Sequence, residues 1–171
     1  MKRLACVAVF YLFLPAVSPQ TTLSTPTDSD LRVPVVWPGT KWCGQGTLAL
    51  HEHDYGSNLE LDLCCKQHDH CPIVIQGYAR RFGLGNFKPF PLSHCSCERV
   101  FHDCLAAQVY NNTGPAGAFS LGQTYFRLTE SKCFELQLSR ICVKYHALFA
   151  TCREVQKDWL AKMLTIDTVF T

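Results

Sequence analysis

Two pairs of cysteines with the same spacing constrain the fold of this chain more than any other sequence feature. Cys64 and Cys71 are seven residues apart, and so are Cys97 and Cys104. Seven residues make about two turns of an α-helix, so the members of each pair would lie on one face of a helix. The spacing therefore predicts two helices that are joined to each other by two disulfides.

The segment between the two pairs indicates how the helices run. Twenty-three residues separate Cys71 from Cys95, which is enough for the chain to turn back. We therefore expect antiparallel helices with bridges Cys64–Cys104 and Cys71–Cys97. Parallel helices are the alternative, and they would require the connecting segment to travel the full length of a helix again.

Local signals place these helices along the chain. Asn58 is a suitable N-cap for a helix from Leu59 to about Gln76, and two acidic residues follow in its first turn, where the helix dipole favours them. Pro72 lies inside this span and could kink or end the helix. A second helix is expected from Cys95 to about Tyr110. Residues 37–58 show no helical period and are expected to form a long loop of the kind that usually carries function.

The C-terminal part gives weaker signals. Tyr125 to Leu128 fits either a strand or a helix. Further on, five apolar residues fall on one face of a helix, and the pattern predicts a helix that packs on the core. These residues are Val155, Trp159, Met163, Ile166 and Phe170. Contact of this face with a membrane is the alternative.

The N-terminus has the pattern of a secretory leader. Lys2 and Arg3 precede an apolar run from Leu4 to Leu14, and small residues follow at Ala16 and Ser18. The run is too short to span a bilayer. We expect a signal peptide over residues 1–18, with an approximate cleavage site. A buried N-terminal helix is the alternative.

Removal of this leader changes two counts. Cys6 leaves with it, so ten of the eleven cysteines remain, an even number that suits five disulfides in a secreted, extracellular protein. The remaining chain has 14 basic and 14 acidic residues, which argues against nucleic acid as a partner. Residues 19–33 are rich in Thr, Ser, Pro and Asp and are expected to be a flexible segment or a propeptide.

A histidine lies between the two cysteines of the first pair. His68 is four residues after Cys64 and three before Cys71, so it should face the second helix between the two bridges. Glu98 follows Cys97 and flanks the opposing face. A histidine held in this way beside a carboxylate is a pre-oriented general base. A core histidine with a structural role is the alternative.

The neighbouring residues indicate a cation site. Asp69 is adjacent to His68, and a glycine-rich loop tied by a cysteine lies upstream at Trp42-Cys43-Gly44-Gln45-Gly46. Calcium binds six to eight oxygen atoms, which backbone carbonyls, a carboxylate and water can provide. We therefore expect a calcium site built from this loop and Asp69.

These motifs together resemble the secreted phospholipases A2, most closely the group III, bee-venom type. The similarity covers roughly residues 35–160. The residues that carry it are Trp37 to Gly46 (WPGTKWCGQG), Cys64 to Pro72 (CCKQHDHCP), Cys95 to Cys104 (CSCERVFHDC), Tyr125-Phe126, Cys133, Cys142 and Cys152.

The resemblance implies a mainly α, disulfide-rich fold over residues 34–171. Two antiparallel helices cross-linked by disulfides would carry the active site, with a calcium-binding loop and a small β element. Five bridges are implied: Cys43–Cys65, Cys64–Cys104, Cys71–Cys97, Cys95–Cys133 and Cys142–Cys152.

The resemblance also implies a reaction, the hydrolysis of the sn-2 ester of a glycerophospholipid. His68 would be the base, and the Gly44 amide would be a second donor to the oxyanion. Calcium would be held by the carbonyls of Trp42, Gly44 and Gly46 and by the Asp69 carboxylate. Tyr125 would belong to the hydrogen-bond network behind the base, although a core aromatic is the alternative. The implied partner is a phospholipid membrane or micelle surface, met by a monomer.

One residue departs from the family pattern, which has Asp where this chain has Glu98. The extra methylene would move the carboxylate by about 1.5 Å if nothing compensates. The sequence therefore leaves open a secreted phospholipase-like binding protein with weak or no activity. A zinc protein is a second alternative, suggested by His51-Glu52-His53-Asp54 and the many cysteines.

Two further features concern the surface. Asn111-Asn112-Thr113 matches a glycosylation acceptor, which predicts a modified Asn111. The loop between the two helices combines basic and aromatic residues, which suits contact with lipid, although an ordinary exposed loop is the alternative. The candidates for this contact are Tyr78, Arg80, Arg81, Phe82, Phe87, Lys88 and Phe90.

Overall fold

The computed structural model describes residues 35–112, 116–147 and 150–167. The expected signal peptide and the segment 19–33 lie outside the described residues. Five disulfides connect the described chain: Cys43–Cys65, Cys64–Cys104, Cys71–Cys97, Cys95–Cys133 and Cys142–Cys152. They are the five pairs that the family resemblance implies.

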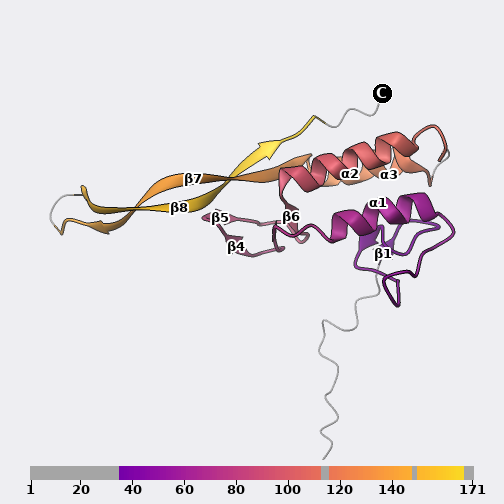
Figure 1. Cartoon of the computed structure of the whole chain (residues 1–171), viewed down its shortest axis with the longest axis horizontal. Helices are drawn as coiled ribbons and strands as arrows, with labels where there is room; N and C mark the ends of the chain where they lie inside the picture. The colour runs from indigo at the N-terminus through magenta and orange to yellow at the C-terminus, as the bar shows by residue number, and fades with distance from the viewer. Residues whose placement is uncertain (1–34, 113–115, 148–149, 168–171) are drawn as a thin grey trace, which may run out of the picture. The chain divides into compact units, whose positions relative to one another are not determined.

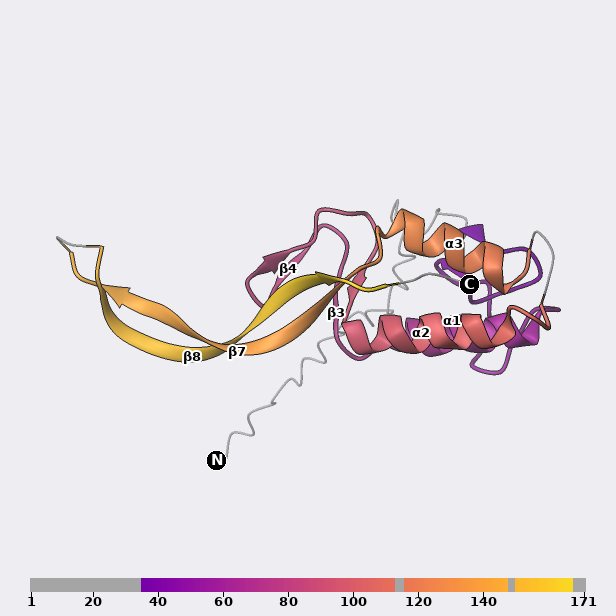
Figure 2. The same cartoon turned by 90° about the horizontal axis from the view of Figure 1, so that it is seen from above.

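Helices α1 (Leu59–Asp69) and α2 (Cys95–Gln108) pack side by side (Figure 1), and in the view from above α2 covers most of α1 (Figure 2). The Cys64–Cys104 bridge joins the middle of α1 to the late part of α2. The Cys71–Cys97 bridge joins the chain just beyond the end of α1 to the first turn of α2. Two bridges at opposite ends fix the helices against each other in opposite directions.

The predicted end of the first helix is wrong. The helix ends at Asp69, with His70 as its C-cap, and not near Gln76. Pro72 disfavours helical backbone at the residue before it, so the chain leaves the helix ahead of the proline. Cys71 is thus not a helical residue, and its bridge starts from the turn that follows the last helical residue.

Residues 125–128, which the sequence allowed to be a strand or a helix, form the end of a third helix, α3 (Ala118–Leu128). It packs on α2 and contributes Leu121 and Phe126 to the core, where they join Phe101 and Leu105 of α2 and Leu61 of α1. Packing of three apolar helix faces produces this core, because none of the helices is long enough to be stable alone.

The predicted C-terminal helix is wrong, because this segment forms a long antiparallel hairpin of β7 (Lys132–Tyr145) and β8 (Cys152–Thr165). The predicted apolar face has a spacing of four residues, at Val155, Trp159 and Met163. This spacing fits one face of a helix. Because four is an even number, it equally fits one face of a strand. Ile166 follows the end of β8, and Phe170 lies outside the described residues.

The remaining strands are short antiparallel pairs of two residues each. The hairpin β7–β8 extends away from the helices, and the β4–β5 turn contacts it, with the Ala161 amide donating to the Phe82 carbonyl at 2.8 Å. Within the described residues, no helix is long and apolar enough to cross a membrane. The strand pairs are β1 (Val35–Val36) with β2 (Gly44–Gln45), β3 (Val74–Ile75) with β6 (Leu92–Ser93), and β4 (Arg80–Arg81) with β5 (Leu84–Gly85).

Candidate active site

His68 lies on α1 and faces α2. Its Nε2 is 2.9 Å from Oε1 of Glu98, which lies in the first turn of α2. Its ring stacks on Phe101 with ring centroids 4.5 Å apart. The side chains of His68 and Glu98 are only 12% and 4% exposed. The imidazole is therefore held by a carboxylate at one nitrogen and by an aromatic ring on one face, and this leaves Nδ1 to accept a proton.

The longer side chain of Glu98 does reach the histidine. Its Oε1 also accepts a hydrogen bond from the Tyr125 hydroxyl at 3.0 Å, and that hydroxyl is 3.3 Å from His68 Nε2. Burial, together with the charge of Glu98, raises the pKa of Tyr125 well above its ordinary value. Tyr125 therefore stays protonated and donates to Glu98, which fixes the orientation of the carboxylate.

A cleft of about 340 Å³ opens beside His68. Its wall includes Pro72, Val100 and Phe101, which are apolar, together with Gln67 and the Cys71–Cys97 bridge. His68 therefore borders a largely apolar space. Such a space is suited to an apolar portion of a ligand, with the polar groups of the site at its edge.

Asp69 ends α1, one residue after His68. The residue is exposed to solvent as a whole, but the atoms packed around its carboxyl desolvate it and raise its pKa to about 6. The nearby His68 and His70 oppose part of this rise. The shift means that the carboxylate is poorly solvated and lacks a strong cationic partner among the described residues. A bound cation would provide that partner.

The glycine loop is tied to the face of α1 that carries Asp69. The bridge Cys43–Cys65 attaches the loop to Cys65, and Cys65 and Asp69 are four residues apart, so they share one helix face. Strand β2 lies within this loop and pairs with β1. A side chain at Gly44 would overlap the carbonyl oxygen of Val35. Only glycine permits this close approach.

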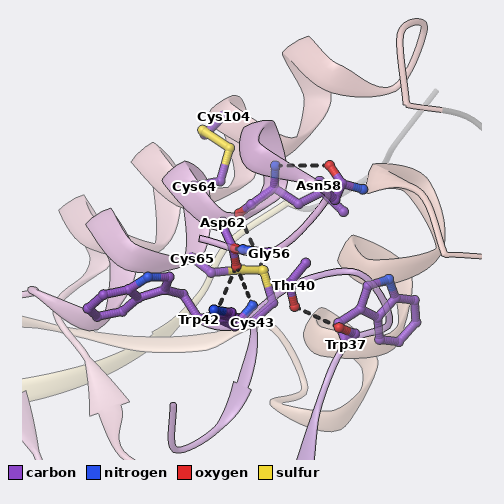
Figure 3. The surroundings of a disulfide bond; sticks show 12 residues. Trp37, Thr40, Trp42, Cys43, Gly56, Asn58, Asp62, Cys64, Cys65 and Cys104 are labelled. Carbon is purple, nitrogen blue, oxygen red and sulfur yellow. Dashed lines mark hydrogen bonds between the residues drawn. A yellow bond between two sulfur atoms is a disulfide. The ribbon is translucent and has the colours of Figure 1, made fainter. Parts of the chain in front are cut away.

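A residue that sequence reasoning missed, Asp62, shapes the same loop (Figure 3). Its carboxylate is fully buried and accepts three backbone N–H groups. Oδ1 accepts from Lys41 at 2.8 Å and from Trp42 at 2.9 Å, and Oδ2 accepts from Gly56 at 2.6 Å. The sequence suggested only a favourable acid in the first turn of a helix. The better signal was the long loop itself, because its buried amides need acceptors.

Charged and aromatic groups surround Trp42 on the outer side of the loop. Lys66 Nζ lies 5.1 Å from the centre of the Trp42 ring and pairs with Glu52 at 2.7 Å. Glu52 also lies 3.3 Å from His70 Nε2. Glu52, which belongs to the His51–Asp54 stretch that suggested zinc, thus contacts Lys66 and His70. The structure contradicts cysteine-bound zinc, because all ten cysteines that it describes are in disulfides and leave no thiolate for the metal. Among the described residues, His51, Glu52, His53 and Asp54 also do not form a group of three or more side chains that could hold a metal ion.

The structure shows how exposed the residues are that the sequence suggested for lipid contact and for glycosylation. Tyr78 and Phe87 are 75% and 88% exposed, whereas Phe82 and Phe90 are partly covered. Asn111 is exposed, and Thr113 of its acceptor motif lies outside the described residues. Lipid contact through residues 78–90 and modification of Asn111 stay predictions.

Comparison with known proteins identifies relatives of this chain. A family model described as phospholipase A2 matches residues 36–137. The chain is 34% identical over 130 residues to phospholipase A2 isozymes of Heloderma suspectum, which covers 76% of this chain and 87% of that protein. It is 31% identical over 125 residues to a phospholipase A2 of Bombus pensylvanicus, with 72% of this chain and 89% of that protein covered. It is 32% identical over 110 residues to a phospholipase A2 of Apis mellifera, with 64% of each covered.

Proposed function

The chain belongs to the phospholipase A2 family and is an ester hydrolase that acts on phospholipids, and from this premise we propose calcium-dependent cleavage of the sn-2 ester with His68 as the general base. The observation that carries the proposal is the hydrogen bond between His68 Nε2 and Glu98 beside an apolar cleft. The five disulfides support secretion, because such bridges persist in oxidising compartments. We further propose that the protein acts as a monomer at a phospholipid surface.

The proton path follows from the tautomer that this hydrogen bond selects. When Nε2 carries the proton and donates to Glu98, Nδ1 has a free lone pair. Nδ1 takes a proton from water as the water oxygen attacks the ester carbonyl, and the imidazolium is stabilised by Glu98. When the tetrahedral intermediate collapses, the same proton passes from Nδ1 to the leaving alkoxide. The products are a fatty acid and a lysophospholipid.

The carbonyl oxygen gains negative charge during the attack and needs donors aimed at it. The backbone amide of Gly44 is the donor that we propose. Asp62 supports this arrangement, because its carboxylate holds the amides of Lys41 and Trp42 immediately before the glycines. The loop is therefore fixed before substrate arrives, and no binding energy is needed to order it.

The residues of the loop fit calcium. The carbonyls of Trp42, Gly44 and Gly46 and the Asp69 carboxylate are hard oxygen donors of the kind that calcium binds. The desolvation that raises the pKa of Asp69 is consistent with the assignment, because a bound cation would stabilise the charged form of this carboxyl. When bound, calcium would act as a Lewis acid that stabilises negative charge on the substrate.

Replacing Asp69 with Asn should weaken calcium binding by about 100-fold or more, because loss of even a supporting partner of a metal ligand costs about 10- to 100-fold. Calorimetric titration with calcium, alongside hydrolysis of phospholipid vesicles at rising calcium, would measure this. Glu60→Gln is the matched control, since Glu60 is an exposed acid on the same helix. Equal calcium affinity in Asp69→Asn and the parent protein would refute the assignment.

Shortening Glu98 to Asp should lower the hydrolysis rate by about 10- to 100-fold, because displacement of a catalytic group by about 1 Å costs up to about 100-fold. The prediction follows from the 2.9 Å contact, which the shorter side chain cannot keep without movement of α2. Steady-state hydrolysis at saturating calcium, with Glu60→Asp as control, would measure it. A faster Glu98→Asp variant would show that Glu98 misplaces the base. No turnover by either protein would favour the phospholipase-like binding protein instead.

A further inference from the structure

One face of the β7–β8 hairpin is apolar and basic, and its side chains are exposed to solvent. Leu138 pairs with Trp159, Arg140 pairs with Lys157, and Val155 lies opposite Cys142. Paired residues of antiparallel strands point to the same side, and so do residues two apart. The hairpin face therefore consists of Leu138, Arg140, Val155, Lys157 and Trp159.

The apolar members of the hairpin face are more than half exposed. Leu138 and Trp159 are each 53% exposed, and Val155 is 57% exposed. Further towards the helices, Met163 on the same face is 41% exposed. A tryptophan and two aliphatic side chains that stay in water together usually mark an interaction surface.

The charges of the hairpin are divided between its two faces. Residues 132–165 contain six basic and three acidic residues, an excess of three positive charges, whereas the whole chain has an excess of two. Glu135 and Asp158 are on the opposite face, where Glu135 is paired with Lys162. No acid lies on the hairpin face between the Phe134–Met163 pair and the Cys142–Val155 pair.

Arg140 and Lys157 are directly opposite each other on this face, and both are exposed. Like charges in this position destabilise a strand pair. No carboxylate of the hairpin face relieves their repulsion. An anion bound between them would do so, and Arg and Lys are the usual partners of phosphate groups.

The size of the face favours a lipid surface over a protein partner. The hairpin face is five residues long on each strand, or about 17 Å, and two strands are about 10 Å wide, so the face covers about 170 Å². A specific protein interface buries about 800 Å² on each partner. A membrane needs no such area of complementary shape, and tryptophan with basic residues is the usual composition at its interface.

We propose that the hairpin face binds the surface of anionic phospholipid membranes. Trp159, Leu138 and Val155 would enter the interfacial region, while Arg140 and Lys157 would contact lipid phosphates. The inference rests on the proposed function, since it assigns a contact to the lipid surface that carries the substrate. Binding through this face needs neither turnover nor calcium, so it can be measured apart from catalysis.

The test uses the inactive His68→Gln variant of the full protein and vesicles of equimolar phosphatidylcholine and phosphatidylglycerol. Each basic residue near an anionic surface contributes about fivefold to binding, so Arg140→Gln/Lys157→Gln should bind about 25-fold more weakly in vesicle sedimentation without calcium. Arg140→Lys/Lys157→Arg should restore binding. The control Arg127→Gln/Lys162→Gln removes the same charge from α3 and from the opposite face and should bind nearly as well as the parent.

Fluorescence gives a second readout at Trp159, which is far more exposed than the buried Trp42. Brominated phosphatidylcholine in the vesicles should quench its emission, and Trp159→Phe should lose the quenching. Undiminished binding of the Arg140→Gln/Lys157→Gln variant, or assembly of the protein into dimers through this face, would overturn the proposal. Loss of hydrolysis in the parent protein with intact vesicle binding would count against the proposed function alone.

Discussion

Replacing His68 with Gln should lower the rate of phospholipid hydrolysis by about 10²- to 10⁴-fold, the usual contribution of a general base. Glutamine can still donate a hydrogen bond to Glu98 and pack against Phe101, so the structure should stay intact. It cannot accept the proton of the attacking water. The expected effect is therefore on kcat, with calcium affinity and thermal stability close to those of the parent protein.

Hydrolysis of phospholipid vesicles and a calcium titration on the same preparation separate these effects. His53→Gln is the matched control, because His53 lies in the exposed part of the loop. If His68→Gln kept most of the activity while His53→Gln lost it, the base would have to be sought elsewhere. If His68→Gln also lost calcium binding or unfolded, its role would be structural and the core histidine alternative would hold.

Replacing Asp62 with Asn should lower the free energy of unfolding by about 2 to 4 kcal/mol, since hydrogen bonds to charged groups contribute about 1.5 to 3 kcal/mol each and a buried donor left unpaired adds to the loss. The amide oxygen can replace Oδ1, which accepts from Lys41 and Trp42, but the NH₂ group then faces the Gly56 amide. Two donors would meet where a donor now meets an acceptor. The loop 37–58 should loosen while the helices stay cross-linked.

Denaturant unfolding with the disulfides intact measures the loss, and calorimetry measures calcium affinity. We expect both to fall together, because two of the three amides that Asp62 holds, those of Lys41 and Trp42, lie at the start of the glycine loop. Glu60→Gln removes an acid from the same helix turn without touching the loop, and it should change neither quantity much. An Asp62→Asn protein with parental stability and weakened calcium binding would instead make Asp62 a direct partner of the cation.

Much of the active site could be predicted from sequence because cysteine spacing places His68 opposite the second helix. This prediction holds although the predicted end of the first helix is wrong. Cys71 is not helical, yet it follows the last turn closely enough to reach Cys97. Short-range spacing is therefore informative even where the exact end of an element is not.

The hairpin and the reach of Glu98 could not be predicted for a different reason. A spacing of four residues fits one face of a helix and one face of a strand, and only the pairing with β7 decides between them. The position of the Glu98 carboxylate depends on its rotamer and on Tyr125, which comes from another helix. Asp62 was missed because its partners lie up to 21 residues away in a loop without periodicity.

The close approach of Gly44 to Val35 bears on how the protein could mature. Strand β1 lies at the start of the described chain and is the surface against which the glycine loop is seated. A protease that trims the N-terminal segment can remove residues 19–33 and leave this strand in place. A cut after Val36 would remove the strand and its pairing with Gly44 and Gln45, and would leave the loop held only by the Cys43–Cys65 bridge and Asp62. We therefore expect the mature N-terminus to lie before Val35, and a chain trimmed past the strand to bind calcium more weakly.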